Sequence, residues 1–213
     1  MTDLPLEWNN RYTHRHFCVG NSNQDAYHWI NCMQWPFAHL WIYGPAQCGK
    51  THMGTLWANR TNATIVVPPA WPETVAGSYV WVDWQDNTDL GCENRFFSFL
   101  QWCHSHQVRT LWTGRCVPSA LNSRIVDVAS RLRSMTAIPV TAPDDTLLER
   151  VLTKKLHDIG WVLSPKKMTF LVTRMPRSFS GIGHIVTAIG NAPSADGLSF
   201  HDLAAIIDAS PQQ

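Results

Sequence analysis

The sequence of 213 residues has few charged side chains and no long apolar run. Charged residues make up 15% of it, and 17 Lys and Arg against 16 Asp and Glu give a net charge of +1. This balance excludes the broad basic field of a protein that coats DNA. No run approaches the roughly 18 apolar residues of a membrane-spanning helix, and the N-terminus lacks the pattern of a secretory signal. We therefore expect a soluble, cytoplasmic protein without a membrane partner.

The six cysteines form no CxxC pair and are scattered, at positions 18, 32, 48, 92, 103 and 116. We interpret them as reduced thiols, because a chain of this length buries a core without disulfides. Two His-x-His pairs, His14/His16 and His104/His106, have no fourth ligand at a recognisable spacing, so we do not expect a zinc site. The eleven tryptophans fall in different segments, which favours core packing over a ligand-binding cage.

Apolar runs typical of strands alternate with helical patterns over the first two-thirds of the chain. The predicted strands are 39–43, 64–67, 79–82, 108–113 and 137–140, and the predicted helices are 50–60, 93–104 and 127–133. Within 93–104 we expect Phe96, Phe97, Leu100 and Cys103 to share one buried face. This alternation predicts an α/β fold with a parallel sheet covered by helices on both faces.

From Asp144 onward the sequence contains no strand pattern. Four helices are predicted there, 145–159, 164–173, 178–189 and 200–208, and Ser164-Pro165 is a typical helix start. We therefore divide the chain into an N-terminal arm (1–10), an α/β base (11–143) and a small all-helical lid (144–213).

The segment Gly44-Pro45-Ala46-Gln47-Cys48-Gly49-Lys50-Thr51 matches the phosphate-binding pattern G-x-x-x-x-G-K-[ST]. In such a loop, backbone N–H groups point at the β-phosphate and the following helix adds its positive end. Lys50 would contact the β- and γ-phosphates, and the Thr51 hydroxyl would bind Mg²⁺. Because a predicted strand precedes the loop and a helix follows it, we predict a site for ADP or ATP with Mg²⁺. Cys48 stands at a free position of the pattern and needs no role.

A second strand ends in a carboxylate that is placed to hold the metal, Asp83. ATPases of this type usually carry another acid at the next position, which orients the attacking water. Here the next residue is Trp84, and Asp86 follows two positions later. Because an indole cannot polarise water, we predict a chain that binds nucleotide well and hydrolyses it slowly.

Four further segments accompany these motifs: 17–23 (FCVGNSN), 110–113 (TLWT), 130–132 (SRL) and 176–179 (PRSF). Together with 44–51 and 82–83, in this combination and order, they resemble the AAA+ domain family of the bacterial replication initiator DnaA, and most closely its short homologue Hda (HdaA in alphaproteobacteria). The resemblance covers nearly the whole chain. It implies that Phe17 and Val19 line the adenine pocket and that Thr113 is the first sensor. It also implies that Arg131 is the arginine finger for a neighbour's γ-phosphate and that Arg177 is the phosphate-contacting sensor of the lid.

The sequence ends at Gln213, without the helix-turn-helix segment through which DnaA reads DNA, and this favours the Hda type. The resemblance then implies an ADP-bound regulator, tethered to the DNA-loaded sliding clamp, that stimulates hydrolysis of ATP held by DnaA. The family's clamp-binding peptide, Q-L-x-L-P-L, is matched at its end by Leu4, Pro5 and Leu6, with Met1 in the slot of the glutamine. The missing glutamine weakens the expectation of clamp binding.

Other interpretations remain open. A free-standing AAA+ ATPase of the helicase-loader type would self-associate through Arg131 and turn over ATP, although Trp84 argues against this. A small-molecule kinase would need a base for its acceptor and an arginine-rich lid, and the segment with Arg177 fits an AAA+ lid better. On spacing alone, Arg131 could be a solvated helix charge, Thr113 a strand-end residue, and Arg174 the phosphate-facing residue of the lid.

Overall fold

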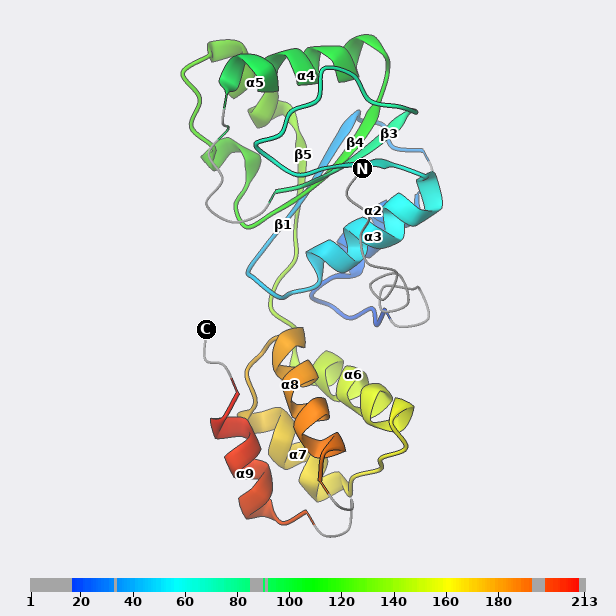
Figure 1. Ribbon diagram of the computed structural model, residues 1–213, viewed down its shortest axis with the longest axis vertical. Coiled ribbons are helices and arrows are strands. Elements are labelled where there is room, and N and C mark those ends of the chain that lie inside the picture. The colour runs from blue at the N-terminus through cyan, green and yellow to red at the C-terminus, as the bar shows by residue number, and fades with distance from the viewer. Residues whose placement is uncertain (1–16, 33, 85–89, 91, 193–197, 211–213) are drawn as a thin grey trace. The chain divides into compact units, whose positions relative to one another are not determined.

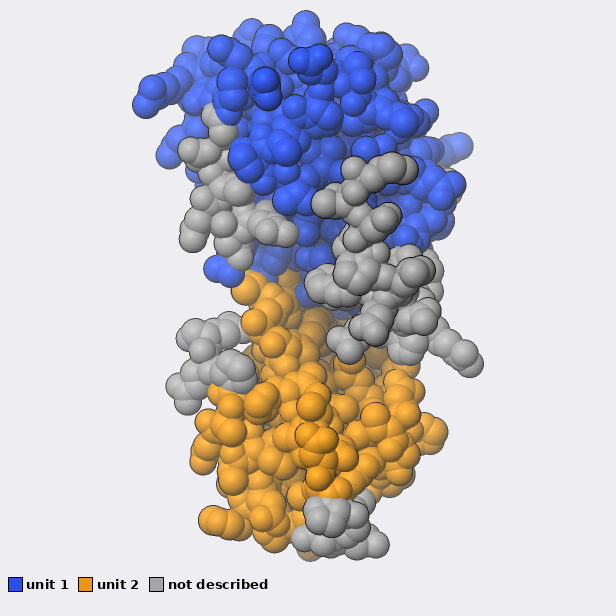
Figure 2. All heavy atoms as spheres, in the orientation of Figure 1, with its two compact units in different colours: residues 1–17, 23–45, 49–140 blue, residues 18–22, 46–48, 141–213 orange. Residues whose placement is uncertain are grey.

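The computed structural model describes residues 17–32, 34–84, 90, 92–192 and 198–210. The chain divides into two compact units (Figure 2). Unit 1 comprises residues 1–17, 23–45 and 49–140, and unit 2 comprises residues 18–22, 46–48 and 141–213. Unit 2 therefore includes two short segments from the N-terminal half, which a contiguous division of the sequence does not anticipate. The arm 1–10 lies outside the described residues.

Unit 1 is built on a parallel sheet. Its strands are β1 (His39–Tyr43), β2 (Thr64–Val66), β3 (Tyr79–Asp83), β4 (Arg109–Gly114) and β5 (Thr136–Pro139), in the order β2-β3-β4-β1-β5. All four strand pairings are parallel. The middle residues of β1, β3 and β4 are buried, as in strands covered on both faces. The predicted α/β class is confirmed.

Helices cover both faces of this sheet (Figure 1). On one face lie α2 (Gln24–Asn31) and α3 (Lys50–Thr61), and on the other lie α4 (Glu93–Ser105) and α5 (Val126–Ser134), the latter preceded by the 3-10 turn η2 (Pro118–Ala120). The sequence analysis did not predict α2, which is short and buries two side chains, Ala26 and Ile30.

The buried face of α4 differs from the prediction in one residue. Phe96, Phe99, Leu100 and Cys103 are buried, whereas Phe97 is partly buried. The helical period explains the error, because Phe97 lies about 100° around the helix from Phe96, and Phe99 lies about 60° away on the other side.

An aromatic cluster fills the space between the sheet and α4. It contains the buried residues Trp41, Trp71, Trp84, Trp112, Phe96 and Phe99. Trp41 and Trp112 stack with ring centroids 5.4 Å apart, and Trp71 lies 4.7 Å from Phe96. These tryptophans are core residues, as the sequence analysis predicted.

Unit 2 is helical in its described residues, with α6 (Asp145–Asp158), α7 (Pro165–Arg174), α8 (Phe179–Gly190) and α9 (Phe200–Asp208). Their ends differ from the predicted ones by at most one residue. The side chains of Asp144, Ser164, Ser178 and Ser199 each accept a hydrogen bond from a first-turn N–H and so cap the four helices. Helix α6 packs against α7 and α8, and α9 packs against the same two helices. None of the helices in the described part of the chain is long and apolar enough to cross a membrane.

Gly54 of α3 permits close packing against the indole of Trp81 in β3. A Cβ atom at Gly54 would lie 2.2 to 2.4 Å from indole atoms, and the indole is held because its Nε1 donates to Thr113 Oγ1 (3.0 Å). We expect Gly54→Ala to lower the free energy of unfolding by about 1–3 kcal/mol in urea denaturation, although alanine favours helix. The matched control is Gly183→Ala in α8, where a Cβ meets nothing within 4 Å. That variant should gain about 0.5–1 kcal/mol, and equal gains in both variants would contradict the argument.

The carboxylate of Glu93, at the start of α4, holds the loop that leads into α5. It accepts hydrogen bonds from Ser123 Oγ (2.7 Å) and from the backbone N–H groups of Arg124 (3.0 Å) and Ile125 (3.2 Å). The bond from Ser123 is the largest cause that lowers the pKa of this carboxyl below its ordinary value of 4.5, and the two backbone bonds act in the same direction.

Because the folded-state pKa of Glu93 is depressed, its stabilising effect is present above the unfolded-state pKa and is lost as the pH falls through the folded-state value. We expect Glu93→Gln to lower the melting temperature at pH 7, and the difference from the wild type to vanish in the acid range below pH 4.5. Thermal melts between pH 7 and about pH 3 would measure this. Glu149→Gln, on the exposed face of α6, is the control and should change the melting temperature little. If the difference in melting temperature between Glu93→Gln and the wild type did not vary with pH, the stabilising role given to the ionised carboxylate would be wrong.

Candidate nucleotide-binding site

The phosphate-loop motif connects β1 to α3. The N–H of Gly44 donates to the carbonyl of Gly114 in the neighbouring strand (3.2 Å). Gly49, the N-cap of α3, has a φ of 97°, and Gln47 has a φ of 59°, so two left-handed residues bend the loop. Lys50 Nζ donates to the carbonyls of Gly44 (2.9 Å) and Pro45 (2.6 Å). The ammonium group therefore lies at the inner curve of the loop.

The other loop residues belong to unit 2. Ala46, Gln47 and Cys48 group with that unit, in which the N–H of Phe179 donates to the carbonyl of Gln47 (3.2 Å). The side chain of Cys48 is buried.

Strands β1, β3 and β4 bring predicted site residues to the same edge of the sheet. The register pairs Asp83 with Thr113, and it pairs Tyr43, the residue before the loop, with Gly114. The Thr113 hydroxyl donates to Asp83 Oδ1 (2.7 Å) and accepts from Trp81 Nε1 (3.0 Å). Thr113 and Asp83 thus form one hydrogen-bonded pair at the edge from which the phosphate loop departs.

The donor set at this edge fits a nucleotide with Mg²⁺. The ammonium of Lys50 and the N-terminus of α3 suit phosphate oxygens. Thr51 lies on the exposed first turn of α3, and Asp83 is half-buried. Hydroxyl and carboxylate oxygens are the ligands that Mg²⁺ prefers, together with phosphate oxygens and waters.

Trp84 belongs to the core. It is 5% exposed, its N–H donates to the Thr113 carbonyl (2.7 Å), and its indole lies in the aromatic cluster, 5.8 Å from Trp41. Asp86 lies outside the described residues. The position after Asp83 therefore offers no acid that could orient water.

The two residues assigned to the adenine pocket by the resemblance fall in different units. Phe17, in unit 1, stacks on Tyr27 (ring centroids 5.0 Å apart) and meets the edge of His52 (5.0 Å). Val19, in unit 2, accepts a hydrogen bond at its carbonyl from Arg150 (3.0 Å). The sequence analysis missed Tyr27 and His52, although His52 directly follows the phosphate loop.

Two arginines of the lid differ in their contacts. Arg177 Nη2 lies 2.9 Å from Asp145 Oδ1, and both side chains are about half exposed. The guanidinium of Arg174 lies 4.3 Å from the centroid of Phe170 on its own helix. Arg177 is also two residues before Phe179, whose N–H contacts the loop carbonyl of Gln47. The assignment of Arg177 rather than Arg174 as the lid sensor stays a prediction.

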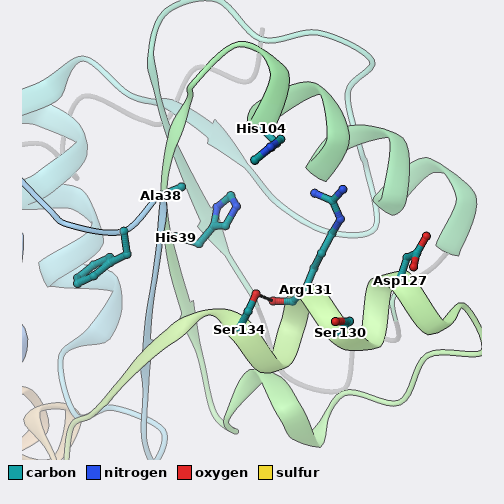
Figure 3. A pocket seen from close by; sticks show the side chains of 8 residues that line it. Ala38, His39, His104, Asp127, Ser130, Arg131 and Ser134 are labelled. Carbon is teal, nitrogen blue, oxygen red and sulfur yellow. Dashed lines mark hydrogen bonds between the residues drawn. The ribbon is translucent and has the colours of Figure 1, made fainter.

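Arg131 lies near the C-terminal end of α5 and lines a cavity of about 550 Å³ (Figure 3). Its Nη2 donates to Gln101 Oε1 (3.4 Å), and its guanidinium lies 5.6 Å from the centroid of Phe97. The remaining lining residues are Phe37, Ala38, His39, His104, Asp127, Ser130 and Ser134. His39 is the first residue of β1, whereas the phosphate loop begins after its last residue, Tyr43. Arg131 and the loop thus lie at opposite ends of β1.

The residues of the predicted clamp-binding peptide, Leu4, Pro5 and Leu6, lie outside the described part of the chain, and so do His14 and His16, for which no zinc site was expected. Among the described residues, no three His, Cys, Asp or Glu side chains are grouped so that they could hold a metal ion.

No known family and no curated protein matches this sequence. Solved structures do match. Domain III of the Thermotoga maritima replication initiation protein DnaA has a TM-score of 0.71 at 15% identity, and the match covers 94% of this chain and 97% of that one. DnaA from Aquifex aeolicus bound to AMPPCP has a TM-score of 0.68 at 16% identity, over 85% of this chain and 65% of that one.

RuvB from Thermotoga maritima has a TM-score of 0.67 at 12% identity, over 89% of this chain and 69% of that one. A structure described as a DNA replication initiation factor has a TM-score of 0.70 at 16% identity. That match covers 84% of this chain and 64% of the other, so this chain spans less than two-thirds of that protein's length. At these identities the likeness establishes the fold, which is a DnaA-like AAA+ fold.

Proposed function

We propose that this chain is a nucleotide-binding AAA+ regulator of the Hda type. It holds ADP or ATP with Mg²⁺ and, together with the DNA-loaded sliding clamp, stimulates hydrolysis of the ATP that DnaA holds. Arg131 acts in trans on that ATP, and the reaction prevents re-initiation of chromosome replication.

The position of Arg131 is the observation that carries this proposal. Arg131 shares its cavity with His39 at the start of β1, while the phosphate loop follows Tyr43 at the end of that strand. Five strand residues span about 13–17 Å, so the guanidinium cannot reach a nucleotide held by the loop of the same chain. Its charge is therefore available to a nucleotide held by another subunit, which is what an arginine finger supplied in trans requires.

The nucleotide site supports the other half of the proposal. Lys50 would neutralise phosphate charge, and Thr51 and Asp83 would hold Mg²⁺, which supplies further charge neutralisation when it is bound. Thr113 orients the carboxylate of Asp83 through its hydrogen bond. The Aquifex aeolicus DnaA that shares the fold was solved with AMPPCP, which is consistent with nucleotide binding here.

The core position of Trp84 favours a regulator over an autonomous motor. A buried indole follows Asp83, where an ATPase of this type needs an acid to orient water. The alternative, a self-associating ATPase of the helicase-loader type, would require rapid turnover by the chain alone.

Hydrolysis of labelled ATP bound to DnaA of the same organism tests the proposal. We expect rapid loss of the label when the chain is added with ADP and DNA-loaded clamp, slower loss without the clamp, and negligible turnover of free ATP by the chain alone. Absence of stimulation while the chain still binds ADP would overturn the regulatory function. Rapid turnover by the chain alone would favour the helicase-loader type instead.

A further inference from the structure

The cavity beside Arg131 has a polar wall drawn from three separate elements. His39 comes from β1, His104 from α4 and Arg131 from α5, and the two rings and the guanidinium surround the same space (Figure 3). Asp127, one turn before Arg131 on α5, lies on the far side of the guanidinium from His39 (Figure 3). His39, His104 and Arg131 thus offer hydrogen-bond donors and a cation to the cavity, and Asp127 is the one carboxylate among its lining residues.

A chain of hydrogen bonds determines which nitrogen of His39 carries its proton. Trp112 Nε1 donates to Thr110 Oγ1 (2.5 Å), and Thr110 Oγ1 lies 2.7 Å from His39 Nδ1. Thr110 is completely buried, so its hydroxyl proton needs an acceptor. Nδ1 of His39 provides that acceptor, which places the ring proton on Nε2. His39 thus presents a fixed N–H, and its ring lies in the cavity wall.

The ring of His39 is neutral at pH 7. Burial is the main cause that lowers its pKa to about 4, and the charges of His104 and Arg131 act in the same direction. A neutral imidazole with a fixed N–H can donate a hydrogen bond without adding charge to the wall. An anion in the cavity would reverse the charge effect on His39, because a nearby negative charge favours the protonated form.

We propose that this cavity is an oxyanion site that receives the terminal phosphate of the nucleotide held by the partner, with His39 and His104 donating hydrogen bonds beside Arg131. The proposal rests on the proposed function, because it takes Arg131 to act in trans. Convergent donors on tetrahedral oxygens hold the phosphate in one orientation, which a single guanidinium on an exposed helix does not achieve. His104 is then a residue that contacts the reacting group, in addition to the finger.

Substitution of His104 tests this contact without risk to the fold, because its side chain is exposed. We expect His104→Leu to lower the maximal rate of DnaA-bound ATP hydrolysis roughly 10- to 150-fold, the range for one lost hydrogen bond to a charged group. His104→Gln keeps a donor and should restore most of the rate. The control is His201→Leu on α9, which should behave as the wild type. A change confined to the concentration needed for half-maximal stimulation would indicate a docking role and overturn the proposal.

Binding of inorganic tripolyphosphate to the chain, with its phosphate loop saturated by ADP, tests the site itself. Imidazole NMR signals of His39 and His104 should shift on addition of tripolyphosphate. Unmoved signals would overturn the oxyanion site.

The two proposals fail in different ways. If Arg131→Ala stimulates DnaA as well as the wild type, the proposed function fails. If Arg131 is required while His104→Leu hydrolyses at the wild-type rate, the proposed function stands and this inference alone is overturned. If tripolyphosphate shifts the imidazole signals but His104→Leu does not change the rate of hydrolysis of DnaA-bound ATP, the cavity binds an anion other than the partner's phosphate, and this inference is likewise overturned.

Discussion

Replacing Arg131 by alanine is expected to abolish the stimulation of DnaA and to leave the binding of ADP by this chain unchanged. An arginine finger neutralises the phosphate charge that develops in the transition state, and its loss costs roughly 10³- to 10⁵-fold in rate. Nucleotide binding should persist because Arg131 lies at the end of β1 opposite to the phosphate loop. The side chain is partly exposed and its polar partner, Gln101, is exposed too, so the fold should survive the change.

Two measurements separate these effects. Hydrolysis of ATP bound to DnaA, in the presence of ADP and DNA-loaded clamp, reports the trans function, and equilibrium titration with ADP reports the chain's own site. Arg133→Ala is the matched control, since Arg133 is an exposed arginine on the same helix, and it should retain stimulation. If Arg131→Ala weakened ADP binding strongly, Arg131 would act on the nucleotide of its own chain and the trans assignment would be wrong.

Features that depend on neighbouring residues in the chain were predictable from the sequence. The phosphate loop is eight consecutive residues, and its chemistry follows from their order. Apolar runs and caps located the strands and most of the helices, because the strand and helix periods are visible within short windows. The pairing of Asp83 with Thr113 requires one more piece of information, namely that β3 and β4 are adjacent and parallel.

Features that depend on packing were not predictable in the same way. Helix α2 is only eight residues long, so its period spans about two turns, and it packs against α3 and β5. The choice of Phe99 over Phe97 in α4 depends on which side of the helix faces the sheet. His104 was examined as half of a His-x-His pair, but its relevant neighbours, His39 and Arg131, are distant in sequence and meet it through the fold.

The second large effect is expected at Lys50. Lys50→Ala should weaken ADP binding by about 100-fold or more, because each charge-assisted hydrogen bond to phosphate is worth about 1.5–3 kcal/mol and Lys50 is placed to make two. Lys50 Nζ already lies at the inner curve of the loop, bound to the carbonyls of Gly44 and Pro45. A phosphate that enters the loop therefore meets the ammonium without a large rearrangement of the side chain.

Thermal stability with and without ADP gives a sensitive readout of this loss. At a free ADP concentration 100 times the wild-type dissociation constant, binding adds about 2.7 kcal/mol to the stability of the wild type. A variant that binds 100-fold more weakly gains only about 0.4 kcal/mol at the same concentration. Lys166→Ala, an exposed lysine in α7, is the control and should keep the full gain. The stability of Lys50→Ala without ADP shows whether the loop has simply unfolded.

The outcome at Lys50 bears on Arg131 as well. Tight ADP binding by Lys50→Ala would mean that the loop is not the nucleotide site, and the slow hydrolysis argued from Trp84 would lose its basis. Stimulation of DnaA would then have to come from Arg131 without a nucleotide-dependent state of this chain. Loss of ADP binding together with loss of stimulation, in a variant that keeps Arg131 and its cavity, would instead show that the bound nucleotide controls whether the finger can act. That result would link the two ends of β1 functionally.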